Sequence, residues 1–298
     1  MFKSTARLAR AFMPFILCCF TTFSANANDT SNDAVHGRSA GCGIFHAGSG
    51  SFLPMEIHLP DADRTYHLRL PDNYDPNRAY PLVFRWHGYG GDGLSGGMDI
   101  EYYSGNDAIV VGADGINKYW SPSADSVNLL FFDRMLETIS GRYCIDLDRV
   151  FSYGFSAGGF FSNFLACERG DVLHANAVVA GGLRGGRRRD KMANWLLGAL
   201  GARAAVPEGG NCKGKVATWF LHDLNDDTVP IAKGKDALER ALFLNGCSAK
   251  TIDDGDGCVR YQGCQTTPVV WCQSSGFGHN IRGDFAPKRV WRFFKDLP

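Results

Sequence analysis

The 298-residue chain predicts an α/β fold with a mostly parallel central sheet and helices on both of its faces. Short apolar runs typical of buried strands alternate along the chain with longer segments of helical pattern. Strands joined by helical crossovers pair in parallel, and both faces of such a sheet have to be covered. The sequence has no internal repeat and no long linker, so residues 28–298 are predicted to form a single domain.

The predicted strands are short apolar runs bounded by turn-forming residues, and the first of them alternates as a half-buried strand does. They are Thr65–Leu70, Pro81–Trp86, Ala108–Gly112, Arg149–Phe155, Ala175–Ala180, Val216–Leu221 and Val269–Cys272. The predicted helices between and after them are Leu129–Tyr143, Gly159–Cys167, Ile231–Asn245 and Pro287–Lys295. The acidic stretch Asp253–Gly257 is predicted to be a turn, because a calcium loop needs spaced ligands and a terminal Glu.

Residues 1–27 are predicted to be a signal peptide, so the mature protein is expected to be secreted, with no membrane segment left after cleavage. The apolar part of this leader is too short to cross a bilayer. The leader consists of a basic start, an apolar core and a small-x-small cleavage sequence: Lys3, Arg7 and Arg10, then Ala11–Phe20, then Ala25-Asn26-Ala27.

The charge and the cysteines of the mature chain narrow the class of protein further. Without the three basic leader residues, 28 Lys and Arg face 31 Asp and Glu, a net charge of −3 that argues against a nucleic-acid partner. An even number of cysteines behind a secretion signal predicts disulfides, whose pairing stays open: Cys42, Cys144, Cys167, Cys212, Cys247, Cys258, Cys264 and Cys272. The sequence contains no C-x₂-C pair, so no metal site is predicted. Cys42 is expected to pin the polar N-terminal segment to the body.

The strongest local signal is Gly154-Phe155-Ser156-Ala157-Gly158, which ends an apolar run and precedes a helix-like segment. This is the sequence form of a nucleophile elbow, a tight strand-to-helix turn that exposes a serine hydroxyl. A second match, Gly93-Leu94-Ser95-Gly96-Gly97, lies in a glycine-rich run with no strand before it. The motif needs the strand and the helix, so the context selects Ser156 over Ser95.

A serine nucleophile needs a base that takes its proton and a carboxylate that orients the base. In α/β-hydrolases these residues follow in the order serine, acid, histidine. Only three histidines follow Ser156: His174 precedes a strand, His222 closes one, and His279 lies in a glycine-rich loop near the C-terminus. The order therefore predicts His279 as the base.

The acid is expected in the loop Asp223–Pro230, directly after a predicted strand. Asp223 is still at the strand end and is too early to reach the histidine. Spacing favours Asp226, with Asp227 as the second choice, and an ordinary turn aspartate as the alternative for both.

Acyl transfer places negative charge on the carbonyl oxygen, which two N–H donors have to stabilise. The backbone N–H of Ala157, directly after the nucleophile, is the first predicted donor. The second is the N–H of Tyr89 in Trp86–Gly91, because this segment follows a buried strand and its glycines allow close approach of the backbone.

These features together resemble the secreted feruloyl esterases of the carbohydrate-esterase type and the related polyhydroxybutyrate depolymerases. The late pattern His-Gly-x-x-Asp-x-x-Val-Pro of that family places its aspartate on Asp226. The resemblance implies an α/β-hydrolase that cleaves hydroxycinnamate esters of plant polysaccharide without a cofactor. Further segments carry it in order: Gly41-Cys42-Gly43, Arg64–Pro71, Tyr80–Gly88, Cys144–Phe151, Asn245-Gly246-Cys247, Tyr261–Cys264 and Pro268–Cys272.

Three departures from the family pattern leave the substrate open. Asp223 and Phe277 stand where glycines are usual, and the segment 184–211 is longer and more basic. The basic cluster Arg184–Lys191 is interpreted as a solvated surface loop, with contact to an acidic group of a substrate as the alternative. Tyr89 and Trp120 are candidates for stacking on a phenolic acyl group, although Trp120 fits a place in the core equally well.

The predicted function is therefore a secreted serine carboxylic ester hydrolase, first of all a feruloyl esterase. A polyhydroxybutyrate depolymerase or an acetylxylan esterase with the same Ser156, Asp226 and His279 is the alternative within this class. The rival from another class is a non-catalytic secreted binding protein on a hydrolase scaffold.

Overall fold

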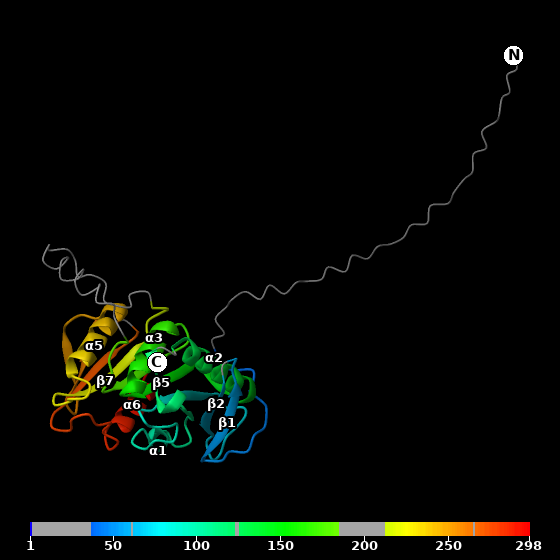
Figure 1. The fold of residues 1–298 in the computed structure, drawn as a ribbon, viewed down its shortest axis with the longest axis horizontal. Helices are drawn as coiled ribbons and strands as arrows, with labels where there is room; N and C mark the ends of the chain where they lie inside the picture. Colours follow the sequence, from blue (N-terminus) through cyan, green and yellow to red (C-terminus); the bar gives the residue numbers. More distant parts are fainter. Residues whose placement is uncertain (2–36, 61, 123–124, 185–211, 265) are drawn as a thin grey trace. The chain divides into compact units, whose positions relative to one another are not determined.

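The computed structural model describes residue 1 and residues 37–60, 62–122, 125–184, 212–264 and 266–298 (Figure 1). The described residues from 37 onward belong to one compact unit. The predicted signal peptide lies outside the described residues except for Met1, and so does the basic segment 184–211 except for Arg184. No helix among the described residues has the length and apolar character needed to cross a bilayer.

A ten-stranded sheet runs through the described unit in the order β1-β2-β4-β3-β5-β6-β7-β10-β9-β8. Its six central strands, from β4 to β10, are parallel, and antiparallel strands complete both edges. This confirms the predicted mostly parallel sheet. The strands are β1 Phe52–His58, β2 Asp63–Arg69, β3 Tyr80–Trp86, β4 Ile109–Ala113, β5 Ile145–Phe155, β6 Ala175–Val179, β7 Ala217–Asp223, β8 Thr251–Gly255, β9 Cys258–Tyr261 and β10 Val269–Ser274.

Helices cover both faces of the sheet, as predicted, because side chains of the central strands alternate between two apolar clusters. In β3, Leu82, Phe84 and Trp86 face α2 and α3, whereas Val83 lies in the cluster that contains α1 and α6. Helix α5 packs on the first face against β6, β7 and β10. The helices are α1 Ile100–Ser104, α2 Asp125–Arg142, α3 Ala157–Glu168, α5 Ile231–Asn245 and α6 Ala286–Lys295, with a 3₁₀ turn η1 at Ile116–Lys118.

The edge strands β1, β8 and β9, whose side chains are only partly buried, were not predicted from the sequence. Strand β1 pairs only with β2 and lies at the edge of the sheet, so its alternation is weak. Strands β8 and β9 form an edge hairpin, and the prediction of a turn over Asp253–Gly257 was wrong for Asp253 to Gly255, which end β8. Helix α2 begins at Asp125, ahead of the predicted start at Leu129.

Two expectations about single residues are settled by burial. Arg184 was interpreted as part of a solvated loop, which is wrong for this residue: its side chain is 5% exposed and forms an ion pair with Asp125. Trp120 is 1% exposed and stacks on Phe161 in the core, with ring centroids 5.1 Å apart. Trp120 is thus a core residue and does not present its ring to a substrate.

The described residues contain four disulfides, which use all eight cysteines of the predicted mature chain. Cys42 is joined to Cys144, so it pins the N-terminal segment to the start of β5, as expected. The other three pairs are Cys167–Cys212, Cys247–Cys264 and Cys258–Cys272.

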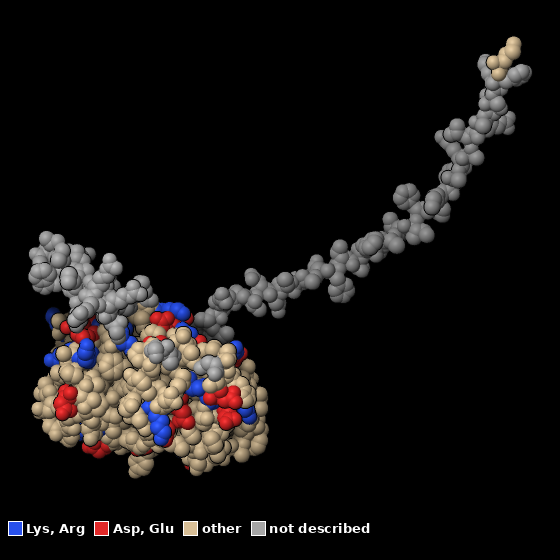
Figure 2. Space-filling model, in the orientation of Figure 1, with Lys and Arg blue, Asp and Glu red and all other residues tan. Residues whose placement is uncertain are grey.

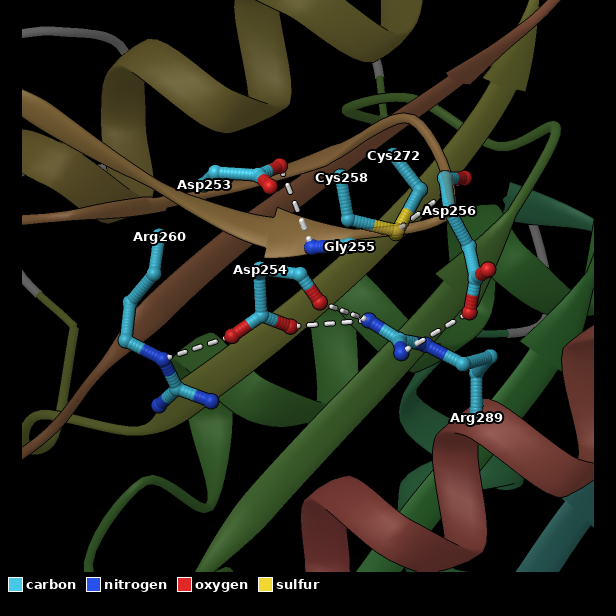
Figure 3. Close-up of a disulfide and its surroundings, with 8 residues drawn as sticks. All are labelled: Asp253, Asp254, Gly255, Asp256, Cys258, Arg260, Cys272 and Arg289. Carbon is cyan, nitrogen blue, oxygen red and sulfur yellow. Dashed lines mark hydrogen bonds and ion pairs between the residues drawn. A yellow bond between two sulfur atoms is a disulfide. The ribbon is translucent and has the colours of Figure 1, made fainter.

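The edge hairpin β8–β9 is fixed to the body by a covalent link and by charge, as Figure 3 shows. Cys258 joins it to Cys272 of β10. From α6, Arg289 donates to the carboxylates of Asp254 (2.9 Å) and Asp256 (3.2 Å). These charge-assisted contacts tie α6 to the outer edge of the sheet.

Acidic and basic side chains are interspersed on the face shown in Figure 2, with large uncharged areas between them. No field of one sign extends over the described part of this face.

We predict that removing the Cys42–Cys144 link lowers the free energy of unfolding by about 2–5 kcal/mol, because the link closes a long loop in the unfolded chain. The two cysteines are 102 positions apart. Chemical denaturation of a Cys42→Ala/Cys144→Ala double variant measures this. An unchanged denaturation midpoint and slope would contradict the expectation.

Candidate active site

The turn from β5 into α3 has the geometry of a nucleophile elbow. Ser156 lies between them with φ 53° and ψ −118°, a strained backbone conformation for a residue with a Cβ. A Cβ at Gly154 would overlap the backbone of Gly158, and a Cβ at Gly158 would overlap the carbonyl oxygens of Trp86 and His87. Glycine at both positions therefore allows the close packing that holds the serine in this conformation.

A chain of buried hydrogen bonds fixes the elbow helix to the sheet. The indole N–H of Trp86 in β3 donates to the Ser152 hydroxyl of β5 (3.0 Å), which is bonded to the Ser162 hydroxyl of α3 (2.6 Å). Ser162 in turn donates to Asn176 of β6. Since buried polar groups are costly unless they are paired, this satisfied chain favours one placement of α3.

Ser156, His279 and Asp226 lie in one hydrogen-bonded row. The Ser156 hydroxyl is 2.8 Å from Nε2 of His279, and Nδ1 of the same ring is 2.8 Å from Oδ2 of Asp226. With its proton on Nδ1, the imidazole donates to the carboxylate and accepts from the hydroxyl. The structure thus brings together the three side chains that the sequence singled out.

The Asp226 carboxylate is fully buried and has several partners. Its Oδ1 accepts from the backbone N–H groups of Thr228 (3.1 Å) and Val229 (2.8 Å). Nε2 of His222 is 3.4 Å from its Oδ2 and donates to the Val229 carbonyl (2.7 Å). Burial lowers the pKa of His222, which keeps that ring neutral beside the carboxylate.

The two other aspartates of this turn do not bond to the His279 ring. Asp227 is exposed and contacts the hydroxyl of Thr228. Asp223 is 4% exposed and accepts from the Asn225 N–H and the Ser274 hydroxyl. The sequence pattern indicated no role for Asp223.

The segment after β3 forms a tight turn beside the elbow. The N–H of Gly91 donates to the Gly88 carbonyl (3.1 Å), and Gly88 is packed against the ring of Phe155 and against Ser156. Tyr89 follows Gly88 in this turn, and Ala157 is the first residue of α3.

The His87 side chain fixes this turn through two hydrogen bonds, a function that the sequence did not indicate. Its Nδ1 donates to the Gly88 carbonyl (2.6 Å), and its Nε2 accepts from the Gly115 N–H (3.0 Å). Burial lowers the pKa of His87, in keeping with a neutral ring that donates on one side and accepts on the other. Its position directly after a buried strand was the only available signal.

Ser95, the serine of the second G-x-S-x-G sequence, is held in a local turn. Its hydroxyl accepts from the Asp92 N–H (2.8 Å) and donates to the Asp92 carboxylate (3.3 Å). A hydroxyl held by an aspartate of its own turn lacks the imidazole base that Ser156 has.

A pocket of about 190 Å³ opens beside the elbow. Its wall includes Tyr89 and Phe155, and Met98 and Ile281 add apolar surface. The Tyr89 side chain is 78% exposed and meets the Tyr119 ring edge-on at 5.2 Å. In the part of the chain that the structure describes, no cluster of His, Cys, Asp or Glu has the makeup of a metal site.

The strand order, the elbow and the Ser–His–Asp row define a serine hydrolase of the α/β-hydrolase fold. Similar folds occur in an acetyl xylan esterase from Aspergillus awamori, with a TM-score of 0.63, 16% identity and coverage of 83% of this chain and 99% of that one. A feruloyl esterase module from Clostridium thermocellum aligns with a TM-score of 0.55 and 13% identity over 88% of this chain and 93% of that one.

No protein-family model matches the chain. Feruloyl esterase D of Neurospora crassa is 33% identical over an alignment of 267 positions, which covers 80% of this chain and 84% of that protein. A probable feruloyl esterase C of Aspergillus niger is 29% identical over 88% of this chain and 93% of that protein. The chain belongs to the feruloyl esterase family, and it is a carboxylic ester hydrolase.

We predict that Gly158→Ala lowers the free energy of unfolding by about 1–3 kcal/mol and removes most esterase activity, because the new methyl group has no space. Gly141→Ala in α2 is the matched control. A Cβ at Gly141 meets no atom within 4 Å, so this variant should gain up to about 1 kcal/mol of helix stability. Urea denaturation and turnover of naphthyl acetate check both; equal behaviour of the two variants would refute the close-packing argument.

Proposed function

We propose that the protein is a secreted feruloyl esterase in which Ser156 is the nucleophile, His279 the general base and acid, and Asp226 the residue that orients the imidazole. The observation that carries the proposal is the hydrogen-bonded row from Ser156 through His279 to Asp226 at a strained elbow. The relatives at 27–33% identity bear the name feruloyl esterase, which supports the choice of substrate.

In the proposed reaction, the Ser156 oxygen attacks the ester carbonyl while Nε2 of His279 takes the hydroxyl proton. Asp226 stabilises the imidazolium that forms and keeps Nδ1 protonated. The N–H groups of Ala157 and Tyr89 stabilise the oxyanion. His279 then gives the proton to the leaving alcohol oxygen, which leaves an acyl-Ser156 ester, and water attacks this ester with the same base to release the acid.

The acyl group is proposed to enter the pocket between Tyr89 and Ile281. A volume of about 190 Å³ suits one aromatic ring with a short side arm, and the pocket has an aromatic and apolar wall of the kind that binds such groups. The exposed Tyr89 ring at the pocket wall supports a stacking contact with a phenolic group. The alcohol part of the substrate is then the carbohydrate of a feruloylated plant polysaccharide.

We also propose that residues 1–27 are a cleaved signal peptide and that residues 28–298 form one secreted domain. The four disulfides support this, since such bonds form and persist in oxidising compartments.

Ser156→Ala is expected to lower kcat for methyl ferulate by about 10⁴-fold or more, because it removes the nucleophile. Ser95→Ala, which removes the serine of the other G-x-S-x-G sequence, should keep kcat within about threefold of the wild type, since its hydroxyl has no base. Because Ser95 lines the pocket beside the elbow, the comparison is made on kcat and not on KM. Steady-state kinetics measures both. The assignment would be wrong if Ser95→Ala lost turnover and Ser156→Ala kept it, and the absence of all ester turnover in the wild type would favour a binding protein.

A substrate panel tests the acyl group. Methyl ferulate should have a higher kcat/KM than naphthyl acetate or short polyhydroxybutyrate chains, because only the ferulate fills an aromatic-lined pocket. Tyr89→Ala should lower kcat/KM for methyl ferulate about 10-fold and leave naphthyl acetate nearly unchanged, since it removes a stacking contact and keeps the backbone N–H. Preference for the acetate or for the polyester would replace ferulate with those substrates.

A further inference from the structure

Two surface segments carry His279 and its acid, and they are bonded to each other beyond the His279–Asp226 contact. We call Asp223–Val229 the acid turn and Ser274–Phe285 the histidine loop. Strands β7 and β10, which precede them, are parallel neighbours with Asp223 opposite Ser274, so both segments leave the sheet at the same edge. Their first hydrogen bond is backbone to backbone, from the Leu224 N–H to the Ser274 carbonyl at 2.9 Å.

Side chains of the acid turn then take up the polar groups of the histidine loop. Oδ2 of Asp223 accepts from the Ser274 hydroxyl (2.8 Å) and from the Phe277 N–H (3.2 Å). Oδ1 of Asn225 accepts from the Gly276 N–H (2.9 Å) and from the Ser275 hydroxyl (3.1 Å). In these side-chain contacts the donors belong to the histidine loop and the acceptors to the acid turn, so the turn binds four polar groups of the loop.

These contacts reach the glycine-containing part of the histidine loop, whose backbone has the most conformational freedom. Gly276 and Gly278 flank Phe277 with φ of 84° and 62°, directly before His279. Glycine reaches such angles without strain, but it also has more conformations to lose than any other residue. Without external partners, the backbone before His279 would therefore sample many orientations of the imidazole.

The second half of the loop is braced by a different contact. The Arg282 guanidinium lies over the Phe277 ring at 3.7 Å and close to the Phe285 ring at 5.2 Å. Helix α6 follows at Ala286 and is tied to the sheet edge through Arg289. The acid turn thus fixes the part of the loop that precedes His279 in the chain, and α6 fixes the part that follows it.

Asp223 is suited to hold the histidine loop because its carboxylate is buried and both of its oxygens accept hydrogen bonds. Burial alone would raise its pKa, but the hydrogen bonds from the Asn225 N–H, the Ser274 hydroxyl and the loop N–H groups prevail and lower the pKa. The group remains an anion, and an anion is the strongest acceptor that the loop N–H groups can have.

We propose that Asp223 and Asn225 are positioning residues that hold the histidine loop so that Nε2 of His279 faces Ser156. Asp223 is the main contributor because it is buried, whereas Asn225 is exposed and its hydrogen bonds compete with water. The proposal rests on the roles assigned to Ser156, His279 and Asp226 in the proposed function, but it does not depend on the acyl group of the substrate.

The test compares variants that keep a hydrogen-bond acceptor with variants that remove it. Asp223→Asn keeps the shape of the side chain and replaces one acceptor oxygen with a donor that faces other donors. Asn225→Asp keeps the Oδ1 acceptor, and Asn225→Ala removes it. Asp253→Ala is the control, because Asp253 is an aspartate that accepts one backbone N–H (3.2 Å) in the edge hairpin, away from the site.

Three readouts separate positioning from loss of the fold: kcat and KM for naphthyl acetate, the thermal midpoint, and the proton NMR signal of the His279 Nδ1–H bonded to Asp226. Asp223→Asn should lower kcat about 10- to 100-fold, the scale of a misplacement near 1 Å, at a KM within about twofold. It should also broaden or remove the NMR signal below the thermal midpoint. Asn225→Ala should show a smaller loss that Asn225→Asp restores, and Asp253→Ala should match the wild type.

The proposal is overturned if Asp223→Asn keeps both kcat and the Nδ1–H signal, or if its loss of kcat equals the fraction of unfolded protein. It is also overturned if Asn225→Asp is as impaired as Asn225→Ala. Failure of the wild type to cleave methyl ferulate, with naphthyl acetate still cleaved, refutes only the substrate assignment. If no ester is cleaved at all, the Nδ1–H signal in the same variants still decides whether these residues orient His279.

Discussion

The imidazole of His279 is hydrogen-bonded through both of its nitrogens, and the fold positions the segments that supply its two partners. Its Nε2 lies 2.8 Å from the Ser156 hydroxyl and its Nδ1 lies 2.8 Å from Oδ2 of Asp226. The three residues come from three separate segments of the chain. A parallel sheet makes this possible because the carboxyl ends of β5, β7 and β10 all reach the same edge. The disulfides and apolar clusters fix the sheet, and the sheet fixes the spacing of the three side chains.

Asp223 and Asp226 are both buried and lie three positions apart, but their different hydrogen-bond donors give them different roles. Asp226 accepts from backbone N–H groups of its own turn and turns its second oxygen to His279. The Asp223 carboxylate instead accepts from the Ser274 hydroxyl and the Phe277 N–H. The residue type is the same in both cases, so the role of each carboxylate is set by which donors the fold places around it.

Two of the three features in which the chain departs from the pattern of the feruloyl esterases it resembles lie at this site. Asp223 and Phe277 both stand where glycines were expected, and the N–H of Phe277 donates to the carboxylate of Asp223. The two departures are thus parts of one contact. Phe277 is also half exposed and lies under the Arg282 guanidinium, so it belongs to the surface beside His279. The family relationship gives the chemistry, and these two residues form a contact beside His279 that departs from the family pattern.

The sequence alone predicted the central strands and the elbow at Ser156, and it singled out His279 and Asp226 as the proposed base and acid. These predictions depend on local apolar pattern, glycine placement and chain order. It did not yield β1, β8 or β9, whose half-exposed side chains leave only a weak alternation. It left the pairing of the cysteines open, since pairing depends on distance in space. It also gave no function to His87, His222, Asp223 and Asn225. His87 and His222 act through groups of the turns that follow β3, β4 and β7. Asp223 and Asn225 act through partners in the histidine loop, which only the folded arrangement of β7 beside β10 brings within hydrogen-bonding distance.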